Sequence, residues 1–453
     1  MAESNVLSLI GNTPLVRVRG LDTGPCELFL KLESQNPGGS IKDRIGLSMI
    51  EAAEREGRIK PGSTLVEATA GNTGLALALV AARKGYRLLL VIPDKMSQEK
   101  IFHLRAMGAE VRMTRSDVGK GHPEYYQDLA ERLAKQIGGF YVNQFENLAN
   151  PAAHETTTGP EIFEQMGGRV DAIVCGVGSG GTITGLSRYF TRTLPELEMV
   201  LADPKGSVLD GYVKTGTLGN AGSWLVEGVG EDFIPRICDL SRVRHSYSIT
   251  DEESFVTARE LLAKEGILGG SSTGLLVSAA LRYCREQRAA KRVVTFVCDS
   301  GNKYLSKMYN DFWMREQGFL RGAPRGDLRD LIARSFEQHS VISLSPQDRL
   351  LVAYSRMKLY DVSQLPVLDN EQIVGIVDES DLLYAAHDDQ SAFQRPVQSI
   401  MSTKLETVQV KDSIESLLPL FDRGLVVIVC DGPRFLGLIT RIDMLNYLRR
   451  KLY

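Results

Sequence analysis

Between about residues 60 and 300, short apolar runs rich in β-branched residues alternate with segments of helical pattern. Such alternation predicts an α/β fold, with a parallel sheet covered by helices on both faces. One further helix-to-strand unit is predicted from a short amphipathic helix at 99–107, followed by Gly108 and a strand at 110–113. The runs interpreted as central strands lie at 87–92, 172–175, 199–202 and 292–298.

The pattern changes after Gly318. Residues 319–327 hold Gly, Pro and Arg with little periodic apolar content, which is typical of a linker. Beyond it, VLDNEQIVGIVDESDLL at 367–383 aligns without a gap on VCDGPRFLGLITRIDML at 429–445. This self-similarity predicts two copies of one β-β-α unit. We therefore divide the chain into an α/β region at 1–318, a linker at 319–327 and a tandem repeat at 328–453, with copies at about 328–390 and 391–453.

Composition excludes several classes of function. The net charge of −3 offers no basic field for nucleic acid. No apolar run approaches the roughly 20 residues that a membrane-spanning helix needs. The first residues are polar and show no signal peptide, so a cytoplasmic location is expected. The six cysteines and six histidines are scattered without metal-ligand spacing, so we predict no metal site.

A glycine-rich turn, CGVGSGGTITG at 175–185, follows one predicted strand and precedes a predicted helix. Glycines let the backbone approach a ligand, and N–H groups at a helix N-terminus bind phosphate. No Gly-x-x-x-x-Gly-Lys-Ser/Thr motif is present, which favours a small phosphate cofactor over a nucleotide. A plain structural turn is the alternative. The residues concerned are Gly178, Ser179, Gly180, Gly181 and Thr182.

Two further turns have the same strand-to-helix setting. EATAGNTG at 67–74 supplies Thr69, Asn72 and Thr73, whose side chains can hydrogen-bond an anion, such as a substrate carboxylate, or a phenolic oxygen. LGGSSTG at 268–274 places Ser271 and Ser272 at another helix start, where a simple N-cap is the alternative interpretation.

Lys42 lies in NPGGSIKDR at 36–44, just inside a helix predicted to begin after the Pro-Gly-Gly turn. Together with GNTPL at 11–15, AGNTG at 70–74 and GSGGT at 178–182, this string resembles the β-family of pyridoxal-phosphate enzymes. The resemblance covers the first 318 residues with the motifs in the same order. It implies a tryptophan-synthase β-like, fold-type II catalytic region of two subdomains, with the cofactor between them.

The same resemblance implies roles for single residues. Lys42 would form the Schiff base with pyridoxal 5'-phosphate, the loop at 178–182 would hold the phosphate, and Asn72 would bond the phenolic oxygen. Ser271 would face the pyridine nitrogen, where a neutral hydroxyl weakens the electron sink and favours elimination at Cβ over transamination. The side chains and loop that would hold the amino-acid carboxylate are Thr69, Ala70, Gly71, Thr73 and Gln144.

Within the family, three strings resemble the cystathionine β-synthases: WLVEGVGEDFIP at 224–235, ADPKGS at 202–207 and CDSGNKYLSKMYNDFWM at 298–314. Glu227 stands where sulfhydrylases usually have glutamine, and we assign it and Gly228 to substrate binding. The resemblance implies condensation of serine or O-acetylserine with homocysteine to cystathionine, through the Lys42 Schiff base and an aminoacrylate. Ala70 departs from the serine common in this loop, so the donor stays open.

Two alternatives remain. HETTTGPEI at 154–162 is nearer to the O-acetylserine sulfhydrylases, which make cysteine from sulfide. The other alternative is an inactive protein that senses an adenosine ligand. No haem is expected, because GNTPL begins at residue 11 and no Cys-Pro or His pair precedes it.

The duplicated region resembles a pair of CBS domains, modules that often bind adenosine compounds. In the second copy Gly437, Thr440 and Asp443 fit the pattern for holding ribose. The first copy has Asp378 in place of the threonine, and its added carboxylates disfavour a phosphate. S-adenosylmethionine or adenosine is therefore the expected ligand, with a ligand-free cap as the alternative. The resemblance also implies a homodimer acting on small amino acids.

Overall fold

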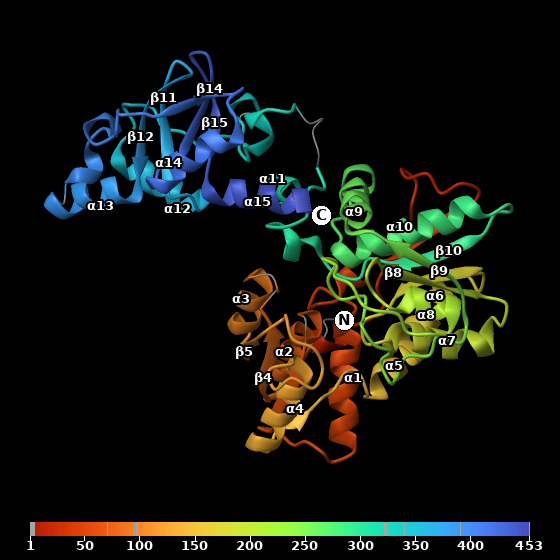
Figure 1. Cartoon of the computed structure of the whole chain (residues 1–453). Helices are drawn as coiled ribbons and strands as arrows, with labels where there is room; N and C mark the ends of the chain where they lie inside the picture. The colour runs from red at the N-terminus through yellow and green to blue at the C-terminus, as the bar shows by residue number, and fades with distance from the viewer. Residues whose placement is uncertain are drawn as a thin grey trace. The chain divides into compact units, whose positions relative to one another are not determined.

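The computed structural model describes residues 5–69, 71–94, 96, 98–320, 325–338, 340–389 and 391–452. It divides into two compact units, Met1–Tyr309 and Asn310–Tyr453 (Figure 1). Helix α11 (Asp311–Glu316) therefore groups with the second unit, although we had assigned it to the first region. The boundary at residue 318 and the linker at 319–327 stay predictions, since residues 321–324 lie outside the described residues.

The first unit contains two sheets, and every neighbouring pair of strands in them is parallel except β1 with β2. The larger has the order β1-β2-β10-β7-β8-β9 and the smaller β5-β4-β3-β6. The four central strands predicted from the apolar runs are confirmed as β4, β7, β8 and β10. The bounds are β1 Leu15–Arg17, β2 Glu27–Lys31, β3 Thr64–Ala68, β4 Arg87–Pro93, β5 Glu110–Thr114, β6 Phe140–Tyr141, β7 Ala172–Gly176, β8 Glu198–Pro204, β9 Val243–Ile249 and β10 Arg292–Phe296.

Helices cover both sheets, and Figure 1 shows α2, α3 and α4 beside β4 and β5. The α/β class with two subdomains is confirmed, and so is the predicted helix followed by β5. A π-helix, η3 (His154–Thr158), joins α5 to α6. The helices are α1 Lys42–Arg55, α2 Asn72–Lys84, α3 Gln98–Ala106, α4 Tyr126–Ile137, α5 Ala149–Ala153, α6 Gly159–Gln165, α7 Gly181–Thr193, α8 Leu209–Thr215, α9 Asp251–Glu265 and α10 Ser271–Glu286.

Helix α10 is buried along nearly its whole length and packs on α9 and on the larger sheet. The two helices approach closely at Gly274, where an added Cβ would lie 1.9 Å from the carbonyl oxygen of Ser254. Since that neighbour is backbone, a side chain at position 274 must move one helix away from the other.

We expect Gly274→Ala to lower the free energy of unfolding by about 3 kcal/mol, at the upper end of the cost of overpacking a core. Gly211→Ala is the matched control, because it also replaces a helical glycine but its Cβ would meet nothing within 4 Å. Urea denaturation followed by circular dichroism would measure both. Equal midpoints for the two variants would contradict the close packing of α9 on α10.

The second unit repeats one β-β-α arrangement, as predicted. β11 (Gln364–Asp369) and β12 (Gln372–Asp378) form one antiparallel pair, and β14 (Val427–Asp431) and β15 (Arg434–Ile439) form the other. Both pairs have a register shift at the equivalent position, after Val367 and after Val429. The remaining elements are α12 Leu350–Tyr360, α13 Glu379–Asp388, β13 Thr407–Gln409, α14 Leu418–Asp422 and α15 Arg441–Leu452.

Among the described residues of the whole chain, none of the helices combines the length and the apolar composition of a membrane span.

Candidate functional sites

The predicted motifs of the first unit meet at the carboxyl ends of parallel strands, where ligands bind in open α/β sheets. The loop with Asn72 follows β3, the loop at 178–182 follows β7, and Cys298 and Asp299 follow β10. The loop before Lys42 joins them, because the N–H of Ile41 donates to the Cys298 carbonyl at 2.8 Å and Ser40 forms a β-bridge with Asp299. The three loops and Lys42 therefore belong to one site.

The loop at 178–182 is shaped so that only glycine fits at its key positions. Gly180 has φ +85°, and α7 begins at Gly181. An added Cβ would lie 2.6 Å from the Gly228 carbonyl oxygen at Gly178, and 1.8 Å from Asn150 Oδ1 at Gly181. Backbone N–H groups at the start of a 13-residue helix are thus left uncovered by side chains, which fits a phosphate group.

The two polar side chains of this loop are held by Asn150 and His154, to which sequence reasoning gave no role. Ser179 Oγ accepts a hydrogen bond from Asn150 Nδ2 at 2.9 Å, and Thr182 Oγ1 lies 3.2 Å from His154 Nε2. Burial, with the charges of Arg44 and Lys42 added, holds the pKa of His154 well below its usual value. A neutral imidazole at this place brings no charge of its own to the loop.

Lys42 is the first residue of α1 and is half-buried. Burial lowers the pKa of its amine, and the neighbouring Cys298, Asp299 and Glu231 oppose that effect. Among the described residues Nζ has no hydrogen-bond or ion-pair partner, so the amine is not held away from a ligand. A lysine with a lowered pKa suits Schiff-base and proton-transfer chemistry. The loop at 178–182 forms a glycine cradle beside Lys42, and together they fit pyridoxal phosphate.

Asn72, the first residue of α2, has both ends of its amide engaged. Its Nδ2 donates to Asp299 Oδ2 at 2.8 Å, and its Oδ1 accepts from Lys303 Nζ at 2.9 Å. Tyr304 donates to the same Asp299 oxygen at 2.8 Å. We did not predict these three partners, although all of them lie in the string CDSGNKY quoted for the resemblance.

The residues expected at the substrate carboxylate are joined to the glycine cradle. Thr73 Oγ1 donates to Gln144 Oε1 at 2.8 Å, and Asn150 Nδ2 donates to the Gln144 carbonyl at 2.8 Å as well as to Ser179. The N–H of Gly71 donates to Thr69 Oγ1 at 3.1 Å. Ala70, also expected here, lies outside the described residues.

Ser271 is the first residue of α10, whose N-cap is Gly270 and makes no side-chain cap bond. Ser271 Oγ instead accepts from the backbone N–H of Glu227 at 3.0 Å, so the simple N-cap interpretation is wrong for this serine. The two predicted site residues are thereby brought together. The next residue, Gly228, lies against the glycine loop, since its carbonyl oxygen is close to Gly178.

The carboxylate of Glu227 is buried between two lysines that we did not predict. Lys100 Nζ lies 2.5 Å from one oxygen, and Lys307 Nζ lies 2.7 Å from the other. Burial alone would raise the pKa of Glu227, but the two ammonium groups lower it below its usual value. Lys100 also packs its side chain under Gly71, where a Cβ would lie 2.7 Å from Lys100 Cδ. Cations thus lie next to the substrate loop, the turn around Gly71 that is expected to hold the substrate carboxylate.

Glu67 is fully buried at the end of β3, two residues before Thr69. Burial raises its pKa to about 8, although the N–H groups of Ala68 and Gln144 donate to the carboxylate. The folded state therefore binds a proton that the unfolded chain releases above its ordinary pKa of 4.5. This contribution to stability is complete below pH 4.5 and is lost as the pH rises through about 8.

We expect Glu67→Gln to flatten the pH dependence of the free energy of unfolding. In the unmodified protein this group gives a slope of up to about −1.4 kcal/mol per pH unit inside the window. Urea denaturation at several pH values between 5 and 8 would measure the slope. Glu56→Gln, an exposed replacement, should leave the slope unchanged, and an unaltered slope in the Glu67 variant would overturn the prediction.

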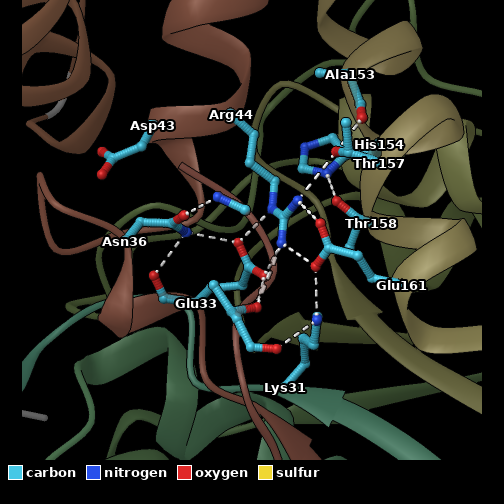
Figure 2. A network of polar contacts seen from close by, with 12 residues as sticks. Lys31, Glu33, Asn36, Asp43, Arg44, Ala153, His154, Thr157, Thr158 and Glu161 are labelled. Atoms are coloured by element: carbon cyan, nitrogen blue, oxygen red, sulfur yellow. Dashed lines mark hydrogen bonds and ion pairs between the residues drawn. The ribbon is translucent and has the colours of Figure 1, made fainter. Parts of the chain in front are cut away.

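Behind Lys42, α1 contributes Arg44 to a buried network of charges. Figure 2 shows the Arg44 guanidinium between the carboxylates of Glu33 and Glu161, with Lys31 beyond Glu161. Burial alone would raise the pKa of Glu161, but hydrogen bonds and the charge of Arg44 lower it to about 2. The network ties the start of α1 to β2 and α6, and so holds the backbone that carries Lys42.

The second unit has a cavity of about 540 Å³ between its two copies. Thr440 and Asp443 line it, and both the N–H and the hydroxyl of Thr440 donate to Asp443 Oδ2, at 2.7 and 2.6 Å. Asp378 and Asp381 form the equivalent cap in the first copy. Gly437 instead lies against Ile332, since its Cβ would be 2.5 Å from Ile332 Cγ2.

Comparisons with known proteins match a different family to each of the two units. Residues 6–299 match the family described as pyridoxal-phosphate dependent enzyme, and residues 333–388 and 397–450 match the CBS domain. The chain is similar to the cystathionine beta-synthase of Dictyostelium discoideum, with 35% identity over 98% of this chain and 92% of that protein. It is also similar to that of Mus musculus, with 42% identity over 70% of this chain but only 57% of the mouse protein.

Among solved structures, the chain is similar to an O-acetylserine dependent cystathionine beta-synthase from Helicobacter pylori. The TM-score is 0.63 with 36% sequence identity, over 68% of this chain and 98% of that one.

Proposed function

This chain belongs to the pyridoxal-phosphate dependent enzymes, and within them to the cystathionine beta-synthases that carry a pair of CBS domains; from that premise we propose that it condenses serine or O-acetylserine with homocysteine to give cystathionine. The observation that carries the proposal is the meeting of Lys42, Asn72 and the loop at 178–182 at the carboxyl ends of β3, β7 and β10. Pyridoxal phosphate is the cofactor of this proposal, and no haem is included in it.

In this proposal Lys42 Nζ holds pyridoxal phosphate, Asn72 binds its phenolic oxygen, Ser271 faces its pyridine nitrogen, and Gly178–Thr182 hold its phosphate. When bound, the cofactor supplies the electron sink that makes the Cα proton of the donor acidic. When it is not attached to the cofactor, Lys42 Nζ would take that proton and later return it; burial lowers the pKa of this amine, which suits proton transfer. Thr69, Ala70, Gly71, Thr73 and Gln144 bind and orient the carboxylate of the donor.

The charges around Glu227 favour an amino-acid thiol over sulfide as the acceptor. Homocysteine has an ammonium and a carboxylate of its own, and such groups need partners of opposite charge when they leave water. Glu227, Lys100 and Lys307 place both signs of charge beside the substrate loop. Sulfide has neither an ammonium nor a carboxylate to pair with these side chains, so cysteine synthesis is the second candidate.

For the second unit we propose an adenosine compound in the cavity between the copies, with Thr440 and Asp443 at the ribose. At the equivalent position of the first copy, S-adenosylmethionine or adenosine fits the added carboxylates better than a nucleotide triphosphate. We also propose a homodimer, on the family resemblance alone, and a location in the cytoplasm.

Initial rates with three substrate pairs test the function: homocysteine with serine, homocysteine with O-acetylserine, and sulfide with O-acetylserine. Each pair is assayed with and without S-adenosylmethionine, after the visible spectrum of the purified protein is recorded. We expect a yellow protein that makes cystathionine faster than cysteine. Faster turnover with sulfide would move the function to cysteine synthesis, and a colourless, inert protein would leave only the adenosine-sensing alternative.

A further inference from the structure

The amide of Asn72 is held at its two ends by groups of opposite charge. Lys303 donates to its carbonyl oxygen and Asp299 accepts from its nitrogen. A primary amide can rotate by 180° and exchange the two ends at little steric cost. Here the exchange would place an N–H against the ammonium and the carbonyl oxygen against the carboxylate, so the charges set the orientation.

Lys303 also holds the loop that leads to Lys42. Its Nζ donates to the carbonyl oxygens of Gly38 at 3.4 Å and Gly39 at 3.2 Å. The residue is only 8% exposed, and it lies in the 3-10 helix η4 (Gly301–Tyr304), directly after the segment that bridges to Ser40. An ammonium group has three N–H donors, and three neutral oxygens accept them here. No donor is left to bind a substrate carboxylate.

We propose that Lys303 is a positioning residue that fixes the amide of Asn72 and the backbone before Lys42 with one ammonium group. The Nδ2 hydrogen that Asp299 does not use is then directed at the phenolic oxygen of the cofactor. This inference rests on the proposed function, because it requires pyridoxal phosphate on Lys42 with Asn72 beside it. Lys303 thus serves as a structural cation within the site. The two lysines that pair with Glu227, Lys100 and Lys307, are different residues.

The test replaces Lys303 in the full-length holoenzyme by methionine, which has no donor, and by arginine, which keeps the charge. The absorption band of the bound cofactor is titrated with pH, and the dissociation constant of the cofactor is measured with kcat and KM. We expect Lys303→Met to move the apparent pKa of the cofactor's absorption band. Cofactor binding should weaken about tenfold and kcat should fall about tenfold, because the variant loses one charged hydrogen-bond partner. KM for homocysteine should change less than twofold, and Lys303→Arg should recover part of the loss.

Lys291→Met is the matched control. Lys291 is also partly buried, with hydrogen bonds to Glu198 and Tyr283, but it precedes β10 and lies at the amino end of that strand, away from the site. A double-mutant cycle with Asn72→Ala checks the route: the effect of Lys303→Met should be smaller once the amide is gone, because only the bonds to Gly38 and Gly39 are then left to lose.

A yellow wild type with an unchanged Lys303→Met spectrum and affinity would overturn this inference alone, whereas a colourless wild type would overturn the proposed function. If Lys303→Met does not fold, Lys303→Gln decides, because it keeps a polar donor but loses the charge: a spectrum and an affinity identical with those of the wild type would also overturn the inference.

Discussion

Lys42→Ala is expected to remove the visible absorption of the protein and to lower the rate of cystathionine formation by about a thousandfold or more. Lys42 Nζ has two proposed tasks, covalent attachment of the cofactor and transfer of the Cα proton, and alanine can do neither. Proton transfer by a positioned side chain alone accounts for about 10²–10⁴ in rate. The measurements are an absorption spectrum and initial rates at saturating substrates.

Two controls make the result specific. Lys135→Ala removes an exposed lysine on α4 and should leave spectrum and rate unchanged. A small primary amine added to the Lys42→Ala protein should restore part of the rate, because it can accept the Cα proton in place of Nζ. An alanine variant that keeps the visible band and more than a tenth of the rate would show that another lysine binds the cofactor.

Much of the fold could be predicted because its signals are local. Alternating apolar runs and helical segments predicted β4, β7, β8 and β10, and the gapless duplication predicted the β-β-α repeat. The register shift after Val367 and after Val429 shows how closely the two copies agree. The family and its two kinds of domain were likewise predicted from short strings, and the comparisons confirm them.

The partners of the site residues could not be predicted in this way. Lys100 pairs with Glu227, which is 127 residues away in the sequence, and Lys303 bonds to Asn72, which is 231 residues away. Most lysines are exposed, so nothing in the local sequence separates these two from the others. Their burial depends on tertiary packing, which brings Lys100 of α3 to Glu227 and brings the segment after β10, with Lys303, against the loops after β3 and before Lys42. The same reason explains why the roles of Asn150 and His154 were missed.

Buried charge is the other feature that a linear pattern hides. Lys31 ends β2 on the same face as Glu27 and Phe29, and as a lysine it would ordinarily be placed in solvent. In the structure it is fully buried and donates to Glu161, Gln165 and the carbonyl of Thr13. A fully buried lysine is tolerated only where such partners replace water. A single substitution of one charge in this network is therefore expected to be costly.

Arg44→Met is expected to lower the free energy of unfolding by about 3–5 kcal/mol, which is the usual cost of removing one partner from a buried ion pair. Lys31, Arg44, Glu33 and Glu161 together are neutral, and loss of the arginine leaves one uncompensated negative charge among buried groups. The guanidinium also donates to Thr157, so the π-helix loses a hydrogen bond. Urea denaturation of the full chain, read from the fluorescence of the first unit's tryptophan Trp224 with Trp313 replaced by phenylalanine, would measure the change.

Arg17→Met provides the comparison, because Arg17 pairs with Glu27 on the surface, where the two side chains are 50% and 37% exposed. Such a pair contributes at most about 1 kcal/mol. Adding Glu33→Gln to Arg44→Met should recover part of the stability, since it removes the charge that the first substitution leaves unpaired. If Arg44→Met costs no more than Arg17→Met, the carboxylates are solvated and the network does not hold α1. If the double variant is less stable than the single one, the penalty comes from lost hydrogen bonds rather than from unbalanced charge.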